Sequence, residues 1–288
     1  KRKYMIIVLM AGALELTGCS QGTSNSAKNG TTGSENTIIS ESDIAILDTE
    51  DMFTERDRDT EYDESECTAI SLSDEETKCD SDGVKMDGQT VTITEGGTYL
   101  LTGSLSNGSV VVDTDKTEKV QLILENVSII NEEGAGICVE QADKVFITLA
   151  DGSTNKIVSN SFTGNEDTNI DGAIFSREDL TLNGSGTLKI TSAAHGIVSK
   201  DDLVLTGGVY QIQSEKQGLS GKESVRIADG TFTITSGTDA IHSEDTDEDT
   251  KGFVYITGGV LTLAAGGDGI SSSYVVQADG GSFDISTS

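Results

Sequence analysis

The chain has 288 residues, and its 19 Lys and Arg against 49 Asp and Glu give a formal net charge of −30. This charge excludes nucleic acid as a partner, because the phosphate backbone dominates such binding and would be repelled. Aromatic residues make up only 5%, Pro and Trp are absent and Gly numbers 33, a composition typical of many short strands joined by tight turns and not of a globular α/β enzyme. It predicts an all-β protein.

Residues 1–18 are predicted to be a lipoprotein signal peptide. Residues 1–3 (KRK) are a basic n-region, residues 4–14 are an apolar segment too short to span a membrane, and the LTGC string at residues 16–19 resembles a bacterial lipobox. Cys19 is therefore the predicted lipidation site, and the expected localisation is extracellular, lipid-anchored to the bacterial cell membrane. The anchor would be the chain's only membrane contact. The alternative is an ordinary signal peptide followed by a cysteine by chance.

Residues 19–50 are predicted to form a flexible polar linker, because they are rich in Ser, Thr, Asn and Gly without apolar periodicity. A domain is expected over 51–288, with an N-terminal cap region at 51–83. The acidic cap region contains the alternating string CTAISLS, which predicts either a first strand or a cap.

Three cysteines follow the linker, namely Cys67, Cys79 and Cys138, so at most one intrachain disulfide can form. The sequence holds no CxxC motif or His/Cys cluster, and a zinc site is not expected.

Internal repeats predict the architecture. Five segments end alike: GSGTLKITS from 184, GGVYQIQS from 207, DGTFTITS from 229, GGVLTLAA from 258 and GGSFDIST from 280. Their first large apolar residues are separated by 22, 22, 29 and 22 positions and are Leu188, Tyr210, Phe232, Leu261 and Phe283. Another column, through Leu203, Val225, Val254 and Val276, has spacings of 22, 29 and 22. A further column, called the isoleucine column, has spacings of 23, 22, 22 and 29 and runs through Ile174, Ile197, Leu219, Ile241 and Ile270.

A repeat of about 22 residues with three short strands is typical of one coil of a parallel β-helix, in which each residue stacks on its counterpart at ~4.8 Å. The leucine-rich repeat frame and the hexapeptides of left-handed β-helices are both missing. The prediction is a single-stranded right-handed parallel β-helix with coils of about 22 residues. The chain stops in mid-coil at Ser288, so we expect a truncated C-terminus, because natural proteins normally cover an open sheet edge.

The 29-residue interval contains a seven-residue insertion between Ile241 and Val254, which predicts a protruding loop with five carboxylates in residues 244–249. An EF-hand is excluded, since Thr250 stands where Gly is needed and Ile256 where the bidentate Glu should be.

A calcium site is predicted at this insertion. Asp239 and Asp268 occupy equivalent positions in adjacent coils, so their carboxylates are expected within ~5 Å of each other. Two anions that close repel by roughly 1 to 4 kcal/mol, and a cation that takes about six to eight oxygen ligands would offset this repulsion. The candidate metal ligands are Asp239, Glu244, Asp245, Asp247, Asp249 and Asp268. The alternative is a solvated acidic loop.

Three cations recur in register three residues past the isoleucine column: Arg177, Lys200 and Lys222. A column of acids follows them: Glu178, Asp201, Glu223 and Asp245. One interpretation is structural, with diagonal ion pairs between the two columns that contribute little at an exposed surface. The other is functional, with a row of carbohydrate-binding cations spaced to meet sugar carboxylates.

Several long strings carry a family likeness: NIDGAIFSREDLTLNGSGTLKITS, HGIVSKDDLVLTGG, GTDAIHSEDTDEDTKGFVYITGG and AGGDGIS. They resemble the calcium-binding parallel β-helix carbohydrate-binding domain family of bacterial cell-surface and secreted proteins, which is similar to pectate lyases and binds cellulose and polygalacturonate. The likeness covers about residues 51–288. It implies a secreted, calcium-loaded module whose partner is a polysaccharide, with metal at Asp239, the 244–249 loop and Asp268. His195 and Gln217 stand at the Asp239 position in their own coils.

The expected function is non-catalytic, calcium-dependent binding of plant cell-wall or other acidic polysaccharides. One alternative is a calcium-dependent pectate-type lyase, in which the metal acidifies a proton and a basic residue removes it. Each candidate base is followed by an acid, which keeps it protonated. Another alternative is a surface adhesin or scaffold. Tyr255 and Tyr274 are the aromatic residues expected to point outward.

Overall fold

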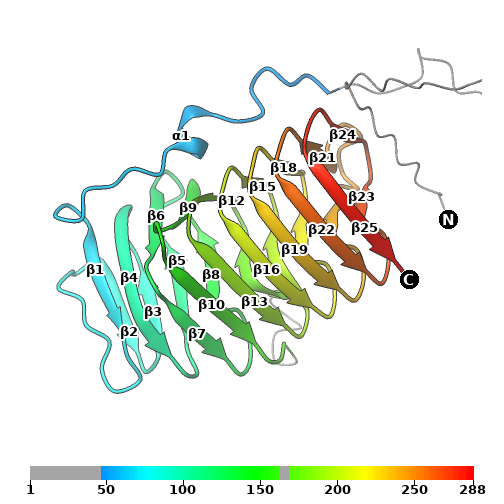
Figure 1. Ribbon diagram of the computed structural model, residues 1–288. Coiled ribbons are helices and arrows are strands. Elements are labelled where there is room, and N and C mark those ends of the chain that lie inside the picture. Colours follow the sequence, from blue (N-terminus) through cyan, green and yellow to red (C-terminus); the bar gives the residue numbers. More distant parts are fainter. Residues whose placement is uncertain (1–46, 163–168) are drawn as a thin grey trace, which may run out of the picture.

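The computed structural model describes residues 47–162 and 169–288 (Figure 1). Within these ranges the chain forms twenty-five strands and one short helix, α1 (Glu55–Arg58), and no helix is long and apolar enough to cross a membrane. The strands stack side by side along an elongated body, almost all of them parallel, so the predicted all-β class is confirmed. The predicted signal peptide, Cys19 and the linker up to residue 46 lie outside the described residues.

The strands form a sixteen-stranded sheet and a nine-stranded sheet. The larger sheet contains two ladders. The first ladder consists of β1 (Thr68–Leu72), β4 (Gly97–Leu105), β6 (Lys119–Leu124), β9 (Lys144–Leu149), β12 (Asp179–Gly184), β15 (Asp202–Leu205), β18 (Ser224–Ile227), β21 (Phe253–Ile256) and β24 (Val276–Ala278). The third ladder consists of β7 (Ser128–Asn131), β10 (Thr154–Ser159), β13 (Thr187–Ser192), β16 (Val209–Ser214), β19 (Thr231–Ser236), β22 (Val260–Ala265) and β25 (Ser282–Thr287).

The nine-stranded sheet is the second ladder. It consists of β2 (Val84–Asp87), β3 (Thr90–Ile93), β5 (Ser109–Asp113), β8 (Ile137–Gln141), β11 (Gly172–Ser176), β14 (His195–Ser199), β17 (Leu219–Gly221), β20 (Ile241–Ser243) and β23 (Ile270–Ser272). The long strand β4 joins the other two ladders, because its first half pairs with β6 and its last residues pair with β7. From β6 onward the chain visits the first, third and second ladders in turn, an arrangement like that of a β-helix.

The apolar columns of the sequence lie in register. In the third ladder Leu188 pairs with Tyr210 and Tyr210 with Phe232, and the column continues through Leu261 to Phe283. The other two ladders align their predicted columns in the same way. The seven-residue insertion lies between β20 and β21. These pairings establish long parallel ladders, whereas the right-handed sense of winding stays a prediction.

The core is a continuous stack of side chains inside the ladders. The rings of Tyr210 and Phe232 are fully buried and stack with their centroids 4.9 Å apart. The Tyr210 hydroxyl donates to the backbone oxygen of Gly207 at 2.7 Å, so the buried phenol keeps a hydrogen-bond partner. Each such fully buried side chain stabilises the fold by about 1.5 to 3 kcal/mol.

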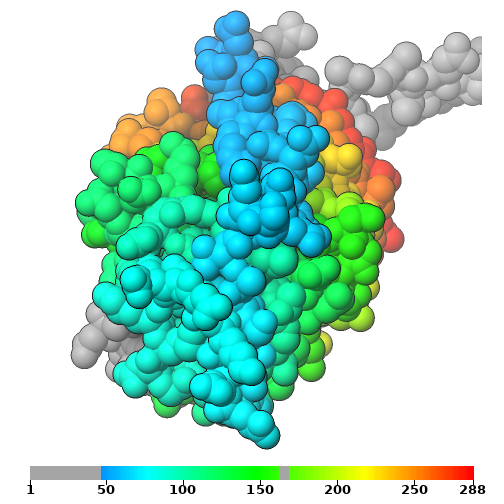
Figure 2. Space-filling view, turned by 90° about the vertical axis from the view of Figure 1, so that its left-hand side faces the viewer, coloured from blue at the N-terminus to red at the C-terminus, as the bar shows by residue number. Residues whose placement is uncertain are grey.

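An N-terminal segment, residues 47–66, runs back along the first ladder and is called the strap here. It begins near the C-terminal end of the stack, where the Leu47 N–H donates to Gln277 of β24 at 3.0 Å. It reaches β6 through Arg56, which donates to Gln121 at 2.8 Å. Figure 2, which looks onto the end of the stack, shows the strap lying on one side of the body. The predicted cap region 51–83 therefore includes a lateral segment, followed by β1, a true strand, from the CTAISLS string.

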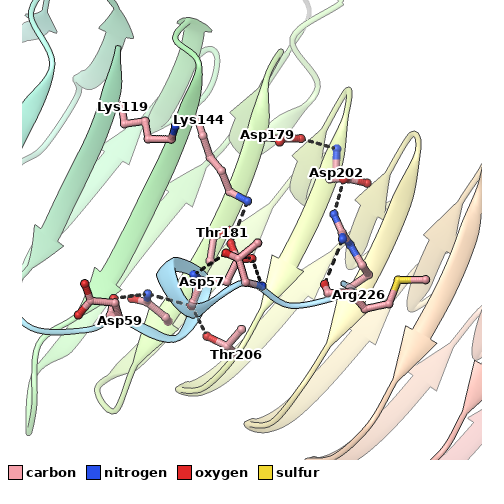
Figure 3. A network of polar contacts seen from close by, with 12 residues as sticks. Asp57, Asp59, Lys119, Lys144, Asp179, Thr181, Asp202, Thr206 and Arg226 are labelled. Carbon is pink, nitrogen blue, oxygen red and sulfur yellow. Dashed lines mark hydrogen bonds and ion pairs between the residues drawn. The ribbon is translucent and has the colours of Figure 1, made fainter. Parts of the chain in front are cut away.

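One buried carboxylate holds the strap to the sheet (Figure 3). The side chain of Asp57 is only 2% exposed; its Oδ1 lies 2.8 Å from Nζ of Lys144 and accepts from the Thr181 hydroxyl at 2.7 Å. The backbone oxygen of Asp57 accepts from Thr206 at 2.6 Å. Burial raises the pKa of Asp57, but the hydrogen bonds from Lys144 and Thr181 outweigh it and hold the pKa at about 2.

A second contact holds the strap farther along the stack. Arg226 of β18 pairs with Asp202 of β15 and donates to the backbone oxygen of Met52 at 3.0 Å. Phe53 stacks beside Tyr255 of β21 with ring centroids 6.0 Å apart. Tyr255 was expected to point into solvent, but the strap covers it and leaves it 4% exposed.

Replacing Asp57 by Ala should lower the free energy of unfolding by on the order of 3 kcal/mol near neutral pH, because Lys144, whose side chain is only 15% exposed, loses its ion-pair partner. The folded pKa of Asp57 lies below its usual 3.8, so the carboxylate stabilises the fold above about pH 4 and loses this contribution as the pH falls toward 2. Urea unfolding of both proteins across this range checks the prediction.

The matched control for this experiment is Asp59→Ala, which removes a 45% exposed carboxylate from the same turn and should cost far less. A difference between the wild type and the Asp57 variant that is the same at low and neutral pH would contradict the prediction.

Candidate functional site

A groove of about 410 Å³ lies on the outer surface of the second ladder, over β14, β17 and β20. Lys200, Lys222, His195, His242 and Glu244 are among the residues that line it. Two of the three predicted carbohydrate-binding cations and one predicted metal ligand therefore meet at one place.

The outer surface of the second ladder changes character along the stack. In register, the outward row passes from Cys138 through Phe175 and Val198 to Ser220 and His242. Its first three members form a small apolar cluster that is separate from the core. The last two are polar, and the groove lies over this second half of the row. Because side chains alternate between the two faces of a strand, one outward column of the repeat forms both the apolar cluster and the polar floor of the groove.

The cation row begins outside the groove. Arg177 lies with its Nε 2.6 Å from Glu140 Oε2, and its guanidinium covers the Phe175 ring at 5.5 Å. Lys200 lies over the same ring at 5.3 Å, with its Nζ 3.6 Å from Asp171 Oδ1 and its side chain 39% exposed. Two cations therefore lie over the apolar cluster, and the cation–π interaction with the Phe175 ring favours this arrangement.

Lys222 is bound to the acidic loop. Its Nζ lies 2.9 Å from Asp247 Oδ2 and 3.9 Å from Asp245 Oδ2. The hydrogen bond to Asp247, followed by the charge of Asp245, raises the pKa of Lys222. The contact with Asp245 is one of the predicted diagonal pairs, whereas Lys200 turns to Asp171 instead. Of the two groove lysines, Lys222 is therefore held in its protonated form.

The loop between β20 and β21 is organised around one buried carboxylate. The Asp245 side chain is 2% exposed, and its Oδ1 accepts from the backbone N–H groups of Asp247 at 2.7 Å and Glu248 at 3.1 Å. Burial raises the pKa of Asp245, but these N–H groups and the nearby Lys222 lower it below its usual value. Asp249 is exposed at the tip of the loop.

The predicted ligands Asp239 and Asp268 are joined through a backbone contact. Asp239 Oδ1 accepts from the backbone N–H of Asp268 at 2.8 Å, and its Oδ2 lies 3.0 Å from Nδ1 of His242. The hydrogen bond to His242 is the main cause that lowers the pKa of Asp239. The Asp268 side chain is exposed. The two positions are equivalent in adjacent coils, and the contact between them joins the Asp239 carboxylate to the Asp268 backbone.

These contacts do not fit a calcium cage. Asp239, Asp245 and Asp247 are engaged by a histidine, by N–H groups or by Lys222, and Glu244 lies 3.7 Å from Nε2 of His242. In residues 47–162 and 169–288, no three His, Cys, Asp or Glu side chains lie together as a possible metal site. The prediction of calcium is therefore not supported by this arrangement and stays a prediction.

The two histidines of the groove were not predicted as site residues. His195 Nδ1 accepts from the backbone N–H of Gln217 at 3.3 Å, and its Nε2 lies 3.4 Å from Asp171 Oδ2. His195, Gln217 and Asp239 share one column of the repeat, which is the signal that could have placed His195 here. His242 stands in the outward row described above, one strand beyond Ser220.

A separate group of carboxylates lies at the turn between the second and first ladders. Burial, followed by the charges of Asp179 and Glu223, raises the pKa of Asp201 to about 7. Lys251 compensates part of this charge through a contact with Glu223 at 2.5 Å. The three described cysteines, Cys67, Cys79 and Cys138, are free.

Comparisons with known proteins agree with this architecture. Residues 87–288 match the family of carbohydrate-binding domain-containing proteins. A carbohydrate-binding domain-containing protein of Acetivibrio thermocellus is 34% identical over 137 residues, which are 46% of this chain and 48% of the relative, so the match spans about half of that protein.

A solved structure of a polysaccharide lyase-like protein from C. thermocellum, a gadolinium derivative, superposes with a TM-score of 0.69 at 30% identity. The superposition covers 75% of this chain and all of that one. A family match over well more than half of the chain and a shared fold lead to one conclusion: the chain belongs to the family of carbohydrate-binding domain-containing proteins.

Proposed function

We propose that this chain is a non-catalytic module that binds polysaccharide, and that polymers of uronic acid are its ligand class. The observation that carries the proposal is the groove of the second ladder, where Lys200 and Lys222 lie about 40% exposed beside two histidines. Cations can meet the carboxylates of such a polymer, and the histidines and Gln217 can bind its hydroxyl groups. Without these cations, a protein with a net charge of −30 would repel an anionic glycan.

The same geometry argues against lyase chemistry. A lyase needs a neutral base to remove a proton, and Asp247 raises the pKa of Lys222. Lys200 lies near Asp171, and Arg177 is paired with Glu140. The name of the C. thermocellum relative, polysaccharide lyase-like, keeps a lyase as the second candidate, and a surface adhesin or scaffold is the third.

Neutralising the groove cations should weaken binding to polygalacturonate. In the double variant Lys200→Gln/Lys222→Gln we expect about a tenfold rise in Kd, equivalent to about 1.4 kcal/mol. Binding of the wild type should also weaken with salt, because exposed charges are screened over ~8 Å near physiological ionic strength. Titration calorimetry at two salt concentrations measures both effects.

The matched control is Lys85→Gln/Lys116→Gln, which removes two exposed lysines elsewhere on the chain. Equal affinity of the groove variant and this control would contradict the assignment of the groove. Absorbance of unsaturated sugar product, followed in the same mixtures, should stay flat. Product that forms with the wild type and not with the groove variant would establish the lyase instead.

Calcium dependence is a separate part of the proposal. It is supported by the charge of the loop at 244–249, because calcium takes carboxylate oxygen ligands. Asp245 and Asp247 hold Lys222, so an ion there requires this lysine to withdraw.

If calcium binds, the melting temperature should rise with calcium and fall with EDTA, by the equivalent of roughly 3 kcal/mol at a hundredfold excess over Kd. Lys222→Met should enlarge this response, because it removes the competing cation. Identical melting curves in calcium and in EDTA would contradict calcium binding.

The proposal places the module at the bacterial surface, exported and anchored through Cys19, on a polar linker that precedes the strap. We also propose that the ladders form a single right-handed parallel β-helix with coils of about 22 residues. Full-length protein expressed in bacteria should incorporate a palmitate analogue and partition into detergent, whereas Cys19→Ala should do neither. Equal labelling of the two proteins would contradict the anchor.

A further inference from the structure

The outer surface of the third ladder is a flat, open and polar sheet. Its strands β10, β13, β16, β19 and β22 lie at the front of Figure 1, and no described segment passes over them. One outward row runs in register across these five strands through Lys156, Lys189, Gln211, Thr233 and Thr262, all of which are exposed. At the usual strand spacing the row spans ~19 Å.

Two cations stand unpaired in this row. Lys156 and Lys189 are direct partners on β10 and β13, so their backbones lie ~4.8 Å apart. Neither forms an ion pair with the described part of the chain, whereas Lys119, Lys144 and Lys251 each do. Two like charges at this spacing repel by about 1 kcal/mol even in water. An anion placed between them would remove this repulsion.

The rest of the surface offers hydrogen-bonding groups that are not used internally. Gln211 and Gln213 on β16 and Thr233 and Thr235 on β19 are exposed, and their side chains bond to no described residue. None of the strands β7, β10, β13, β16, β19 and β22 contains an acidic residue, in a chain that has 49 of them. The surface therefore combines two free cations with an ordered array of hydroxyl and amide groups, and it carries no large aromatic side chain.

We propose that this surface, over β10, β13, β16 and β19, is a second binding site for acidic polysaccharide. The lysine pair binds carboxylates of successive or neighbouring sugars, and the Gln and Thr side chains bind hydroxyl groups along the chain. The choice of ligand rests on the proposed function, but the site lies on a different sheet from the groove. Charge complementarity selects a uronic acid polymer over a neutral glycan, because the surface has no aromatic ring on which a neutral sugar can stack.

Two sites on one rigid body raise the affinity for a long polymer through effective concentration. The experiment therefore compares four proteins on polygalacturonate: the wild type, Lys156→Gln/Lys189→Gln, the groove variant Lys200→Gln/Lys222→Gln, and the control Lys85→Gln/Lys116→Gln. We expect Lys156→Gln/Lys189→Gln to raise Kd about tenfold relative to the control without a change in melting temperature. A charge-preserving variant, Lys156→Arg/Lys189→Arg, should retain binding, and a neutral glucan should bind all four proteins equally weakly.

The possible results separate the two proposals. If Lys156→Gln/Lys189→Gln binds as the control does while the groove variant is weakened, the third-ladder site is overturned and the proposed groove stands. If the third-ladder variant loses affinity and the groove variant does not, this site is supported and the groove assignment fails. If the wild type binds no polygalacturonate, both are overturned.

Discussion

Parallel pairing in register is the constraint on which the whole structure depends. Each strand of a ladder bonds to the strand one repeat later, so an apolar residue such as Tyr210 must stack on its counterpart Phe232. A slip by one residue would turn every inward side chain outward, and burial of the columns therefore fixes the register strongly. Because the inward columns are fixed, the outward columns are fixed too. Rows of charge and of hydroxyl groups on the surface follow from the packing of the core.

The three ladders use their outer surfaces differently. The first ladder carries Thr181 and Asn183, which are fully buried under the strap and bond to the side chain and backbone of Asp57. Buried polar groups need such partners, and the strap supplies them. The second ladder is covered by an apolar cluster and two cations over its first half and opens into the groove over its second. No segment among the described residues covers the third ladder.

Electrostatics decides what the surface can bind. In a chain with a net charge of −30, several of the described lysines are held by carboxylates, as Lys144 is by Asp57 and Lys222 by Asp247. A lysine held this way can attract an anion but is a poor base, which favours binding over catalysis. Lys156 and Lys189 differ because neither forms an ion pair with a residue of 47–162 or 169–288. The absence of acidic residues from β7, β10, β13, β16, β19 and β22 therefore distinguishes the third-ladder surface from the groove, which Glu244 helps to line.

The sequence alone determined the all-β class, the columns of the core and the position of the acidic insertion, because a stacked architecture repeats the same local pattern and makes long-range pairing visible as spacing. The outward positions of Lys200 and Lys222 follow from the same columns. Only the tertiary structure decided what each side chain contacts. The strap that covers Tyr255 and the inserted loop that holds Lys222 lie outside the repeat, so no spacing reports these contacts. The pairing of Asp239 with His242 joins two residues of one coil and depends on how the side chains turn, which spacing does not report either. The same holds for the predicted calcium ligands: equivalent positions in adjacent coils fix the backbone spacing, whereas hydrogen bonding decides which way a carboxylate turns.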